Sequence, residues 1–552
     1  MKTNQKKKSS RNAMIFIYLQ CYFVTIASIL GVGVLGLPVT LANAGLYPFL
    51  VTFILGSVIQ GLLVYFFVEL LQIAYAAQNN VSSGKEEMVP LNDMLGDESC
   101  DEIEIEHMDS NTGPVLAGHV IMPKSQDTES PSLYTLGSLF LGFGFKQCFE
   151  ISLLLQFVGF LISYALAGSE AYAQVIGVDF RFVIPAFVWL CTFAIVFAQQ
   201  LVQPIVSVLT FFKGSLLLGT VFITFVVGSK VHREIHNDFK ASGEPFLMGT
   251  VALGGVINSM PMMYSKIKPE QKEIKHFRLS VILGLMTCMV LNVLWCWAVL
   301  DIVPQISTFP CHEGSHVQCF SNISLEKSKS LGEISTIPLT EIINSRYPEY
   351  RWVSYLVETF IVVSITVSFL VSGAVLYHTF VFITVSGWIK SLWTKDKESN
   401  YKSKKKCING ECVCNKIISL FLFAIVFTVA MLDPRGFVEM LEKYSSLTLN
   451  LEAGLFVFLM MLKAKKMYTL QQKIPLRIPR YMRPLQYTVP LYFGFAVVYD
   501  IYNAVRDIIQ EHSLEGGTHT NSTHMNSTIS HLLNHIGTTH LPWNATNLTT
   551  LF

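Results

Sequence analysis

Two ionisable side chains stand inside apolar stretches that are long enough to cross a membrane. Lys213 lies near the middle of "PIVSVLTFFKGSLLLGTVFITF", and Glu452 lies deep in "SSLTLNLEAGLFVFLMM". A charge at the bilayer centre costs at least ~2.5–3.5 kcal/mol, so each side chain should face the protein interior and have a partner or a role. A buried lysine can release and regain a proton, and a carboxyl group can carry one. Both residues are therefore candidates for ion coupling. The alternatives are a snorkelling lysine and a carboxyl group that only hydrogen-bonds between helices.

Helix-breaking residues crowd the middle of the first apolar stretch, "SILGVGVLGLPVTLANAG". Gly31, Gly33 and Gly36 fall within six residues, and Pro38 follows. Irregular backbone in hydrocarbon leaves polar groups unpaired, so it survives only where it lines a cavity. An unwound stretch exposes N–H groups at one half-helix end and C=O groups at the other, which can hold a carboxylate and a cation. The alternative is a face of small residues for close helix packing.

A second interrupted stretch, "GTVALGGVINSMPMMYSKIKP", follows five apolar stretches later. Gly254, Gly255 and Pro261 interrupt it, and it also contains the polar residues Asn258 and Ser259. Interrupted helices at matching positions of two halves are the best sequence indication of a transporter site. The pair predicts two five-helix halves of inverted topology.

Composition identifies the kind of protein that must position these residues. The 552 residues are 51% hydrophobic and only 14% charged, with a mean hydropathy of +0.45; about 25% charged residues is usual for a soluble domain. Apolar stretches of about 20 residues recur, which predicts a polytopic all-α membrane protein embedded in the lipid bilayer. The first stretch is too long for a signal-peptide core, so no cleaved signal is expected. The net charge of +1 comes with no basic patch outside the loops, so no nucleic-acid partner is predicted.

Eleven transmembrane helices are predicted: a 5+5 inverted repeat with broken helices 1 and 6, plus helix 11. Their approximate ranges are 14–44, 48–76, 148–175, 181–199, 201–228, 246–264, 278–302, 352–388, 415–432, 436–462 and 484–508. The predicted organisation is a cytosolic N-terminal tail (1–13), helices 1–2 (14–78), an acidic cytosolic loop (79–146), helices 3–7 (147–302), an outer loop (303–351), helices 8–11 (352–508) and an outer tail (509–552). The acidic loop holds twelve Asp and Glu residues and is expected to be disordered.

The distribution of lysine and arginine predicts that the N-terminus lies in the cytosol and the C-terminus lies outside the cell or in a lumen. The expected location is the plasma membrane or a lysosomal or endosomal membrane. The inner segments are rich in both residues, and the tail from residue 510 has neither. N-glycosylation sequons fall on the predicted outer side, in loop 303–351 at Asn322 and in the tail at Asn521, Asn526, Asn544 and Asn547. Asn80 is also in a sequon, but it faces the cytosol in this topology. Cys311 and Cys319 of "CHEGSHVQC" could pair in an oxidising lumen.

The first-helix sequence "GVGVLGLPVTLANAG" resembles the signature of the amino-acid/auxin permease family, and "NSMPMMYSKIK" resembles that family's interrupted sixth helix. The resemblance covers about 14–78 and 148–508. It implies the leucine-transporter-like fold and amino-acid transport by alternating access. It also implies that the substrate's carboxylate and amine are held by two backbone segments, one of Gly31, Val32, Gly33, Val34 and Gly36, and the other of Asn258, Ser259 and Met260.

The sequence does not decide whether transport is coupled to a proton or to a sodium ion. Some proton-coupled members of the wider superfamily carry a lysine on the fifth helix where relatives bind sodium, and Lys213 resembles that case. Hydroxyl groups on the eighth predicted helix (352–388) could instead complete a cation site against the first helix, or they could form ordinary hydrogen bonds between helices. These hydroxyls belong to Ser364, Thr366 and Ser368, with Ser372 one turn further along.

The predicted function is a proton-linked secondary transporter of amino acids. The alternatives are a sodium-coupled transporter and an amino-acid sensor of the same fold that signals to a cytosolic partner through loop 79–146. No nucleophile–base pair or phosphate-binding loop occurs, so an enzyme is not predicted. Cys407, Cys412 and Cys414 lack zinc spacing and a fourth ligand, so neither a metal nor a cofactor is predicted.

Overall fold

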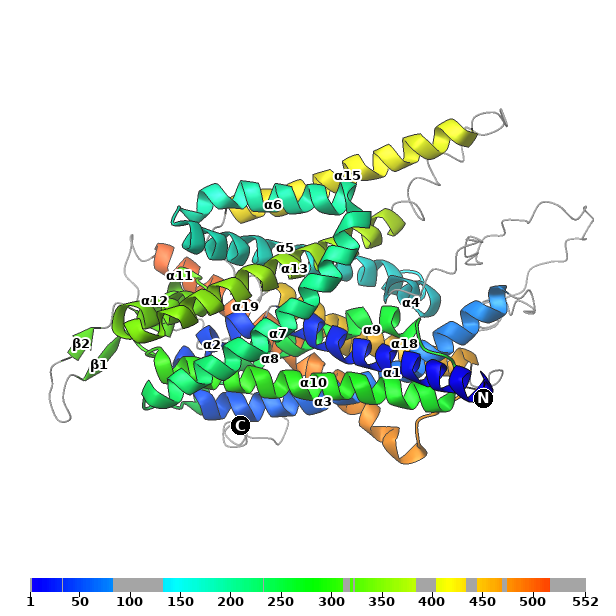
Figure 1. The fold of residues 1–552 in the computed structure, drawn as a ribbon, viewed down its shortest axis with the longest axis horizontal. Helices are drawn as coiled ribbons and strands as arrows, with labels where there is room; N and C mark the ends of the chain where they lie inside the picture. The colour runs from blue at the N-terminus through cyan, green and yellow to red at the C-terminus, as the bar shows by residue number, and fades with distance from the viewer. Residues whose placement is uncertain are drawn as a thin grey trace, which may run out of the picture.

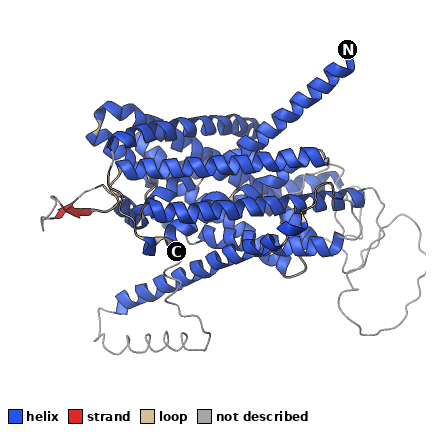
Figure 2. Ribbon diagram, turned by 90° about the horizontal axis from the view of Figure 1, so that it is seen from below, coloured by secondary structure: helices blue, strands red, loops and turns tan. Residues whose placement is uncertain are grey.

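The structure is a computed structural model. It describes residues 2–31, 33–82, 133–231, 233–310, 318–320, 323–383, 404–432, 444–468 and 474–516. Within these ranges it is a bundle of long helices that run roughly parallel to one another (Figures 1 and 2).

Eight helices of the described part are long and apolar enough to cross a membrane, or nine when one bent pair is taken as a single span. The chain is therefore an all-α polytopic membrane protein, as predicted. The helices in the bundle are α1 (Lys2–Ile29), α2 (Gly33–Ala44), α3 (Leu46–Ser82), α5 (Phe145–Ile176), α6 (Phe180–Phe197), α7 (Gln199–Val231), α8 (Gly243–Gly254), α9 (Val256–Tyr264), α10 (Gln271–Ile302), α13 (Arg351–Ile383), α15 (Lys404–Leu432), α17 (Ser446–Leu451), the π-helix η8 (Glu452–Phe456), α18 (Val457–Tyr468) and α19 (Thr488–Gly516).

Each of the eleven predicted ranges overlaps one or more of the described helices. However, α15 is described as apolar only over Lys416–Leu432, and α19 is not among the helices that meet the length and composition of a span. The number eleven and the inverted repeat therefore stay predictions.

The helices pack side by side over long distances in the sequence. In Figure 1, α1, α10 and α3 lie together on one side of the bundle, and α6 and α15 lie on the opposite side. Between them, α13 packs against both α5 and α7. These central helices surround the candidate site.

A small folded unit, which we call the cap, covers the end of the bundle opposite the start of α1 (Figure 1). It comprises a two-stranded antiparallel hairpin and short helices: β1 (Thr308–Pro310), β2 (Gln318–Phe320), α11 (Leu325–Leu331), α12 (Thr336–Arg346) and η3 (Pro348–Tyr350). The cap is bound to α2, because the Ser335 backbone N–H donates to the Leu35 carbonyl at 3.1 Å. The Gln305 side chain also donates to the carbonyls of Leu41 and Ala42, each at 3.3 Å.

Shorter elements complete the described chain. They are α4 (Leu133–Phe140) and the 3-10 turns η2 (Phe239–Ala241), η9 (Arg480–Met482) and η10 (Pro484–Tyr487). The end of the bundle that carries α4 and the start of α1 is called the α1 end below (Figure 1).

The first apolar stretch is broken where its glycines predict, but over fewer residues. α1 ends at Ile29 and α2 begins at Gly33, and the two helices are inclined by 45°. Leu30 and Gly31 lie in no helix, and Val32 is not among the described residues. Gly36 and Pro38, expected in or beside the unwound stretch, lie within α2.

The sixth stretch is interrupted less than expected. α8 and α9 are separated by Gly255 alone, whose φ of −61° and ψ of −13° keep it in the right-handed helical region. The two pieces qualify together as one span, Gly243–Tyr264. The matching pair of fully broken helices predicted from the sequence is therefore corrected to one broken helix and one helix with a local irregularity.

Candidate functional site

Lys213 is enclosed by the bundle, as its place in the sequence predicts. Only 2% of the side chain is exposed, and Nζ donates to Oγ of Ser368 on α13 at 2.8 Å. No carboxylate of the described residues forms an ion pair with it. The thiol of Cys288 on α10 is its other titratable neighbour. An amine with one hydroxyl partner and no counter-charge is an unusual occupant of a helix bundle.

The break in the first helix lies directly beside this amine. A Cβ atom placed on Gly31 would lie 3.3 Å from Oγ of Ser368 and 2.9 Å from the hydroxyl of Tyr164. The Tyr164 hydroxyl, on α5, also faces Ser368. On the other side, Sγ of Cys288 contacts the carbonyl oxygen of Ile26, in the last turn of α1, at 3.9 Å. Lys213, Ser368, Tyr164 and Gly31 thus form one polar cluster.

The half-helix ends supply charges of opposite sign to this cluster. The C-terminal end of α1 presents carbonyl groups that have no partner further along the helix, and the N-terminal end of α2 presents free N–H groups. The first end favours a cation and the second an anion. The Lys213 amine, beside the end of α1, lies where a cation is favoured, and the start of α2 is where an anion is favoured.

The irregular sixth helix packs onto this break. Oγ of Ser259 donates to Oγ of Ser28 at 3.2 Å, and a Cβ on Gly255 would lie 2.8 Å from the Ser28 carbonyl oxygen. The side-chain oxygen of Asn258 is buried and has no hydrogen-bond partner in the described structure, and Met260 is fully buried. Asn258 therefore has a buried acceptor that makes no hydrogen bond within the described part of the chain.

Gly33 packs closely against the neighbouring helix. A Cβ at Gly33 would lie 2.2 Å from the Cβ of Ala252 on α8, so the space beside Gly33 is filled by α8. This contact fits the packing alternative, and the role of Gly33 in substrate binding stays a prediction. Val34 and Gly36 are buried in α2.

The hydroxyl groups predicted on α13 do not all face the cluster. Ser364 and Ser368 are four residues apart and share a helix face, whereas Thr366 lies between them on another face. Oγ of Ser364 is buried without a partner in the described chain. The Thr366 hydroxyl instead lies 3.0 Å from the Tyr172 hydroxyl on α5.

Glu452 occupies a second polar region, where η8 packs against α19 and α5. The residue is 0% exposed, and neither carboxyl oxygen has a hydrogen-bond partner in the described part of the chain. Its neighbour Asn450 donates to Ser446 at 2.9 Å and to Asp500 of α19 at 3.3 Å, and Ser446 donates to the same Asp500 oxygen at 3.0 Å. A π-helical turn such as η8 is frequent at functional sites.

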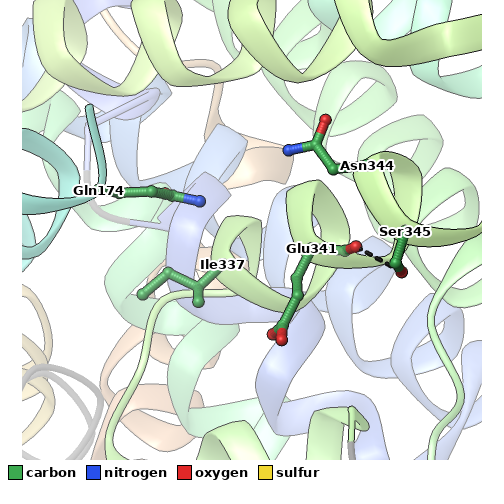
Figure 3. A pocket seen from close by; sticks show the side chains of 5 residues that line it. All are labelled: Gln174, Ile337, Glu341, Asn344 and Ser345. Carbon is green, nitrogen blue, oxygen red and sulfur yellow. Dashed lines mark hydrogen bonds between the residues drawn. The ribbon is translucent and has the colours of Figure 1, made fainter. Parts of the chain in front are cut away.

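A surface pocket of about 420 Å³ opens at the cap end, between α5 and α12 (Figure 3). It is lined by Gln174, Ile337, Glu341, Asn344 and Ser345. Nε2 of Gln174 donates to Oγ1 of Thr340 at 2.6 Å. The pocket includes none of the residues predicted from the sequence.

Sequence reasoning identified Lys213, Glu452 and Ser368, but it did not identify Tyr164 or Asp500. Tyr164 is one of 21 tyrosines, and nothing in its local sequence distinguishes it. Asp500 carried a usable signal, because it is an acidic residue inside the predicted range 484–508.

Several predicted sites lie outside the described residues or at their edge. They are Val32, Cys311, Asn322 and the tail sequons at Asn521, Asn526, Asn544 and Asn547. Cys319 is described only as part of β2, where its backbone pairs with Phe309. The glycosylation sites and the disulfide therefore stay predictions.

No protein-family model matches this chain, and no curated protein matches it. The resemblance to the amino-acid/auxin permeases thus depends on the residues quoted above and stays a prediction.

Proposed function

We propose that this protein is a secondary transporter that moves amino acids across a membrane by alternating access, driven by protons. The observation that carries the proposal is the buried amine of Lys213, which has no carboxylate partner among the described residues and lies beside the break of the first helix. A structural lysine would be expected to pair with an acid or to reach the membrane surface. Lys213 does neither.

In this proposal, each half of the broken helix interacts with a group of opposite charge. The N–H groups at the start of α2 bind the substrate carboxylate, and the buried side-chain oxygen of Asn258 accepts a hydrogen bond from the substrate amine. The protonated Lys213 interacts with the carbonyl end of α1 and with Ser368. Loss of the proton removes the charge from this end, so the two protonation states favour different arrangements of α1 against α13.

Sodium coupling and sensing are the competing proposals. A sodium ion bound between the first and eighth predicted helices would place its positive charge where the Lys213 ammonium already supplies one. A sensor would keep the same amino-acid site, and it would act on a cytosolic partner through residues 79–146 without moving its ligand. Flux across a sealed membrane separates the sensor from both transporters.

Uptake of a radiolabelled amino-acid panel into proteoliposomes, with proton and sodium gradients imposed separately, tests the proposal. We expect uptake with an inward proton gradient and no requirement for sodium. The Lys213→Met variant should fall to the level of empty vesicles. Lys213→Arg should not restore uptake fully, because arginine does not release its proton. Lys230→Gln, at the exposed end of the same helix, is the control and should transport normally.

A stability measurement makes this test independent of folding. Lys213→Met removes a buried charge without a carboxylate partner, so its melting temperature should equal or exceed that of the wild type. Wild-type uptake by this variant, or uptake that depends strictly on a sodium gradient, would refute proton coupling through Lys213. Saturable binding without uptake would favour the sensor.

A further inference from the structure

A second cavity, of about 580 Å³, lies between α3, α18 and the segment that leads into α19. Glu69 and Ile73 of α3 and Lys465 of α18 line one side, and residues from Ile474 to Tyr487 line the other. α18 lies towards the α1 end of the bundle (Figure 1). The cavity is therefore remote from the cap.

The charges that line this cavity are strongly unbalanced. Four cationic side chains border it, against the single carboxylate of Glu69; they are Lys465, Arg477, Arg480 and Arg483. Glu69 accepts a hydrogen bond from the Ile478 backbone N–H at 3.4 Å, and Lys465 donates to Gln486. Within the described chain, neither Arg480 nor Arg483 forms an ion pair with a carboxylate. Arginine forks held around one cavity match the oxygen atoms of a phosphate group.

The remaining lining is apolar and adjoins the membrane boundary. Ile73, Leu462, Ile474 and Pro484 contribute hydrocarbon surface to the same cavity. Tyr487, at its edge, is 58% exposed, and Tyr481, between the arginines, is 78% exposed. Exposed tyrosines at the ends of apolar helices are typical of the headgroup level of a bilayer.

We propose that this cavity binds an anionic phospholipid, with its phosphate headgroup on the arginines and the start of its acyl chains along the apolar wall. Basic pockets between transmembrane helices are suited to such headgroups. A free phosphate ion would satisfy the arginines but would leave the apolar wall uncovered. This inference does not depend on the proposed transport function.

Melting temperature with added lipid tests the proposal on the full-length protein in phosphatidylcholine nanodiscs. The probe is dioctanoyl phosphatidylinositol bisphosphate, and inositol trisphosphate provides the same kind of headgroup without acyl chains. A ligand that binds the folded state raises the melting temperature with its concentration. We expect a rise with the lipid, and a much smaller rise with inositol trisphosphate at equal concentration.

Two double variants assign the effect to the cavity. Arg480→Gln/Arg483→Gln should abolish the lipid-dependent rise. Lys272→Gln/Lys275→Gln, which removes two exposed charges near the start of α10, should retain it. Equal rises in both variants would overturn the site. An equal rise with inositol trisphosphate would make it a site for free anions. A rise in melting temperature that occurs only after residues 84–130 are deleted would show that the acidic segment of this chain, and not a lipid, occupies the cavity in the full-length protein.

Discussion

At the scale of single residues, Glu452 and Asp500 are two buried carboxyl groups with different surroundings. Asp500 accepts hydrogen bonds from Ser446 and Asn450, whereas both oxygens of Glu452 lack a partner in the described structure. A carboxyl group that is satisfied by donors stabilises a helix contact, and one that is left without donors does not. Asp500 therefore fits a structural role, and Glu452 fits a functional one.

Amide substitutions distinguish these two roles. Asp500→Asn weakens two hydrogen bonds in a buried network, so it should destabilise the fold by about 1–3 kcal/mol. Glu452→Gln keeps the shape of a side chain that accepts no hydrogen bond, so its melting temperature should be unchanged or higher. Its proton-driven uptake should nevertheless fall. Thermal melting and uptake of the two variants check this, and equal losses of stability would contradict the assignment.

Glu333, between α11 and α12 in the cap, predicts a pH dependence of stability. Its partial burial and the neighbouring Glu341 carboxylate raise the pKa of its carboxyl group above the ordinary 4.5. The Ser328 hydroxyl donates to it at 3.0 Å, Lys327 lies nearby, and the carboxyl group of Glu170 faces it from α5. The folded protein therefore holds this proton more tightly than the unfolded chain. The associated stability is present below pH 4.5 and is lost as the pH rises through the raised pKa.

Glu333→Gln should accordingly raise the melting temperature at neutral pH and have little effect near or below pH 4.5. Glu349→Gln, on the exposed η3 turn of the same cap, is the matched control and should have little effect at either pH. Melting curves in one detergent across this range give the comparison. An equal effect of Glu333→Gln at both ends of the range would contradict the pKa argument.

At the scale of elements, the broken first helix was predictable, but its packing was not. The density of glycines at residues 31–36 located the break within a few residues, because helix propensity is a local property. The sequence could not indicate that Gly33 would be helical, since its environment is set by Ala252, more than 200 positions away. The same limit applies to Gly255, whose neighbour is the carbonyl of Ser28.

The contact between Gly33 and Ala252 can be tested by compensation. Gly33→Ala should destabilise the protein by about 1–3 kcal/mol through overpacking. The double variant Gly33→Ala/Ala252→Gly should recover part of this loss, because the second change removes the opposing Cβ atom. Gly219→Ala, on α7 with open space around its added Cβ, should be neutral or slightly stabilising. Equal melting temperatures of Gly33→Ala and Gly219→Ala would show that α2 and α8 are not in close contact.

At the scale of the whole molecule, the two ends of the bundle carry different sequons. Asn80 lies near the end of α3, and Asn322, which is not among the described residues, falls in the sequence between β2 and α11; α3 ends at the α1 end of the bundle, and β2 and α11 lie at the opposite end (Figure 1). Only one side of a membrane carries N-linked glycans. In any one orientation, therefore, only one of the two sites can carry a glycan. The distribution of lysine and arginine favours Asn322.

Enzymatic deglycosylation of the protein from eukaryotic cells should produce a mobility shift. The shift should disappear when Asn322 and all four tail sequons are changed to Gln, and it should persist in Asn80→Gln. A shift that survives loss of the five predicted outer sites would invert or discard the predicted topology.

The two halves of the first helix differ in what else they contact. Both pack against α10, but α2 is also bound to the cap through the Leu35 carbonyl, and to Gln305, just before the cap, through the carbonyls of Leu41 and Ala42. The segment 30–32 is the covalent link between them. Restraint of the cap therefore acts on α2 directly, and on α1 only through this link and through α10. An antibody fragment that recognises the exposed side of α12 would act on the site at a distance. It would trap a single conformation and leave the membrane-embedded surface, and the lipid around it, untouched.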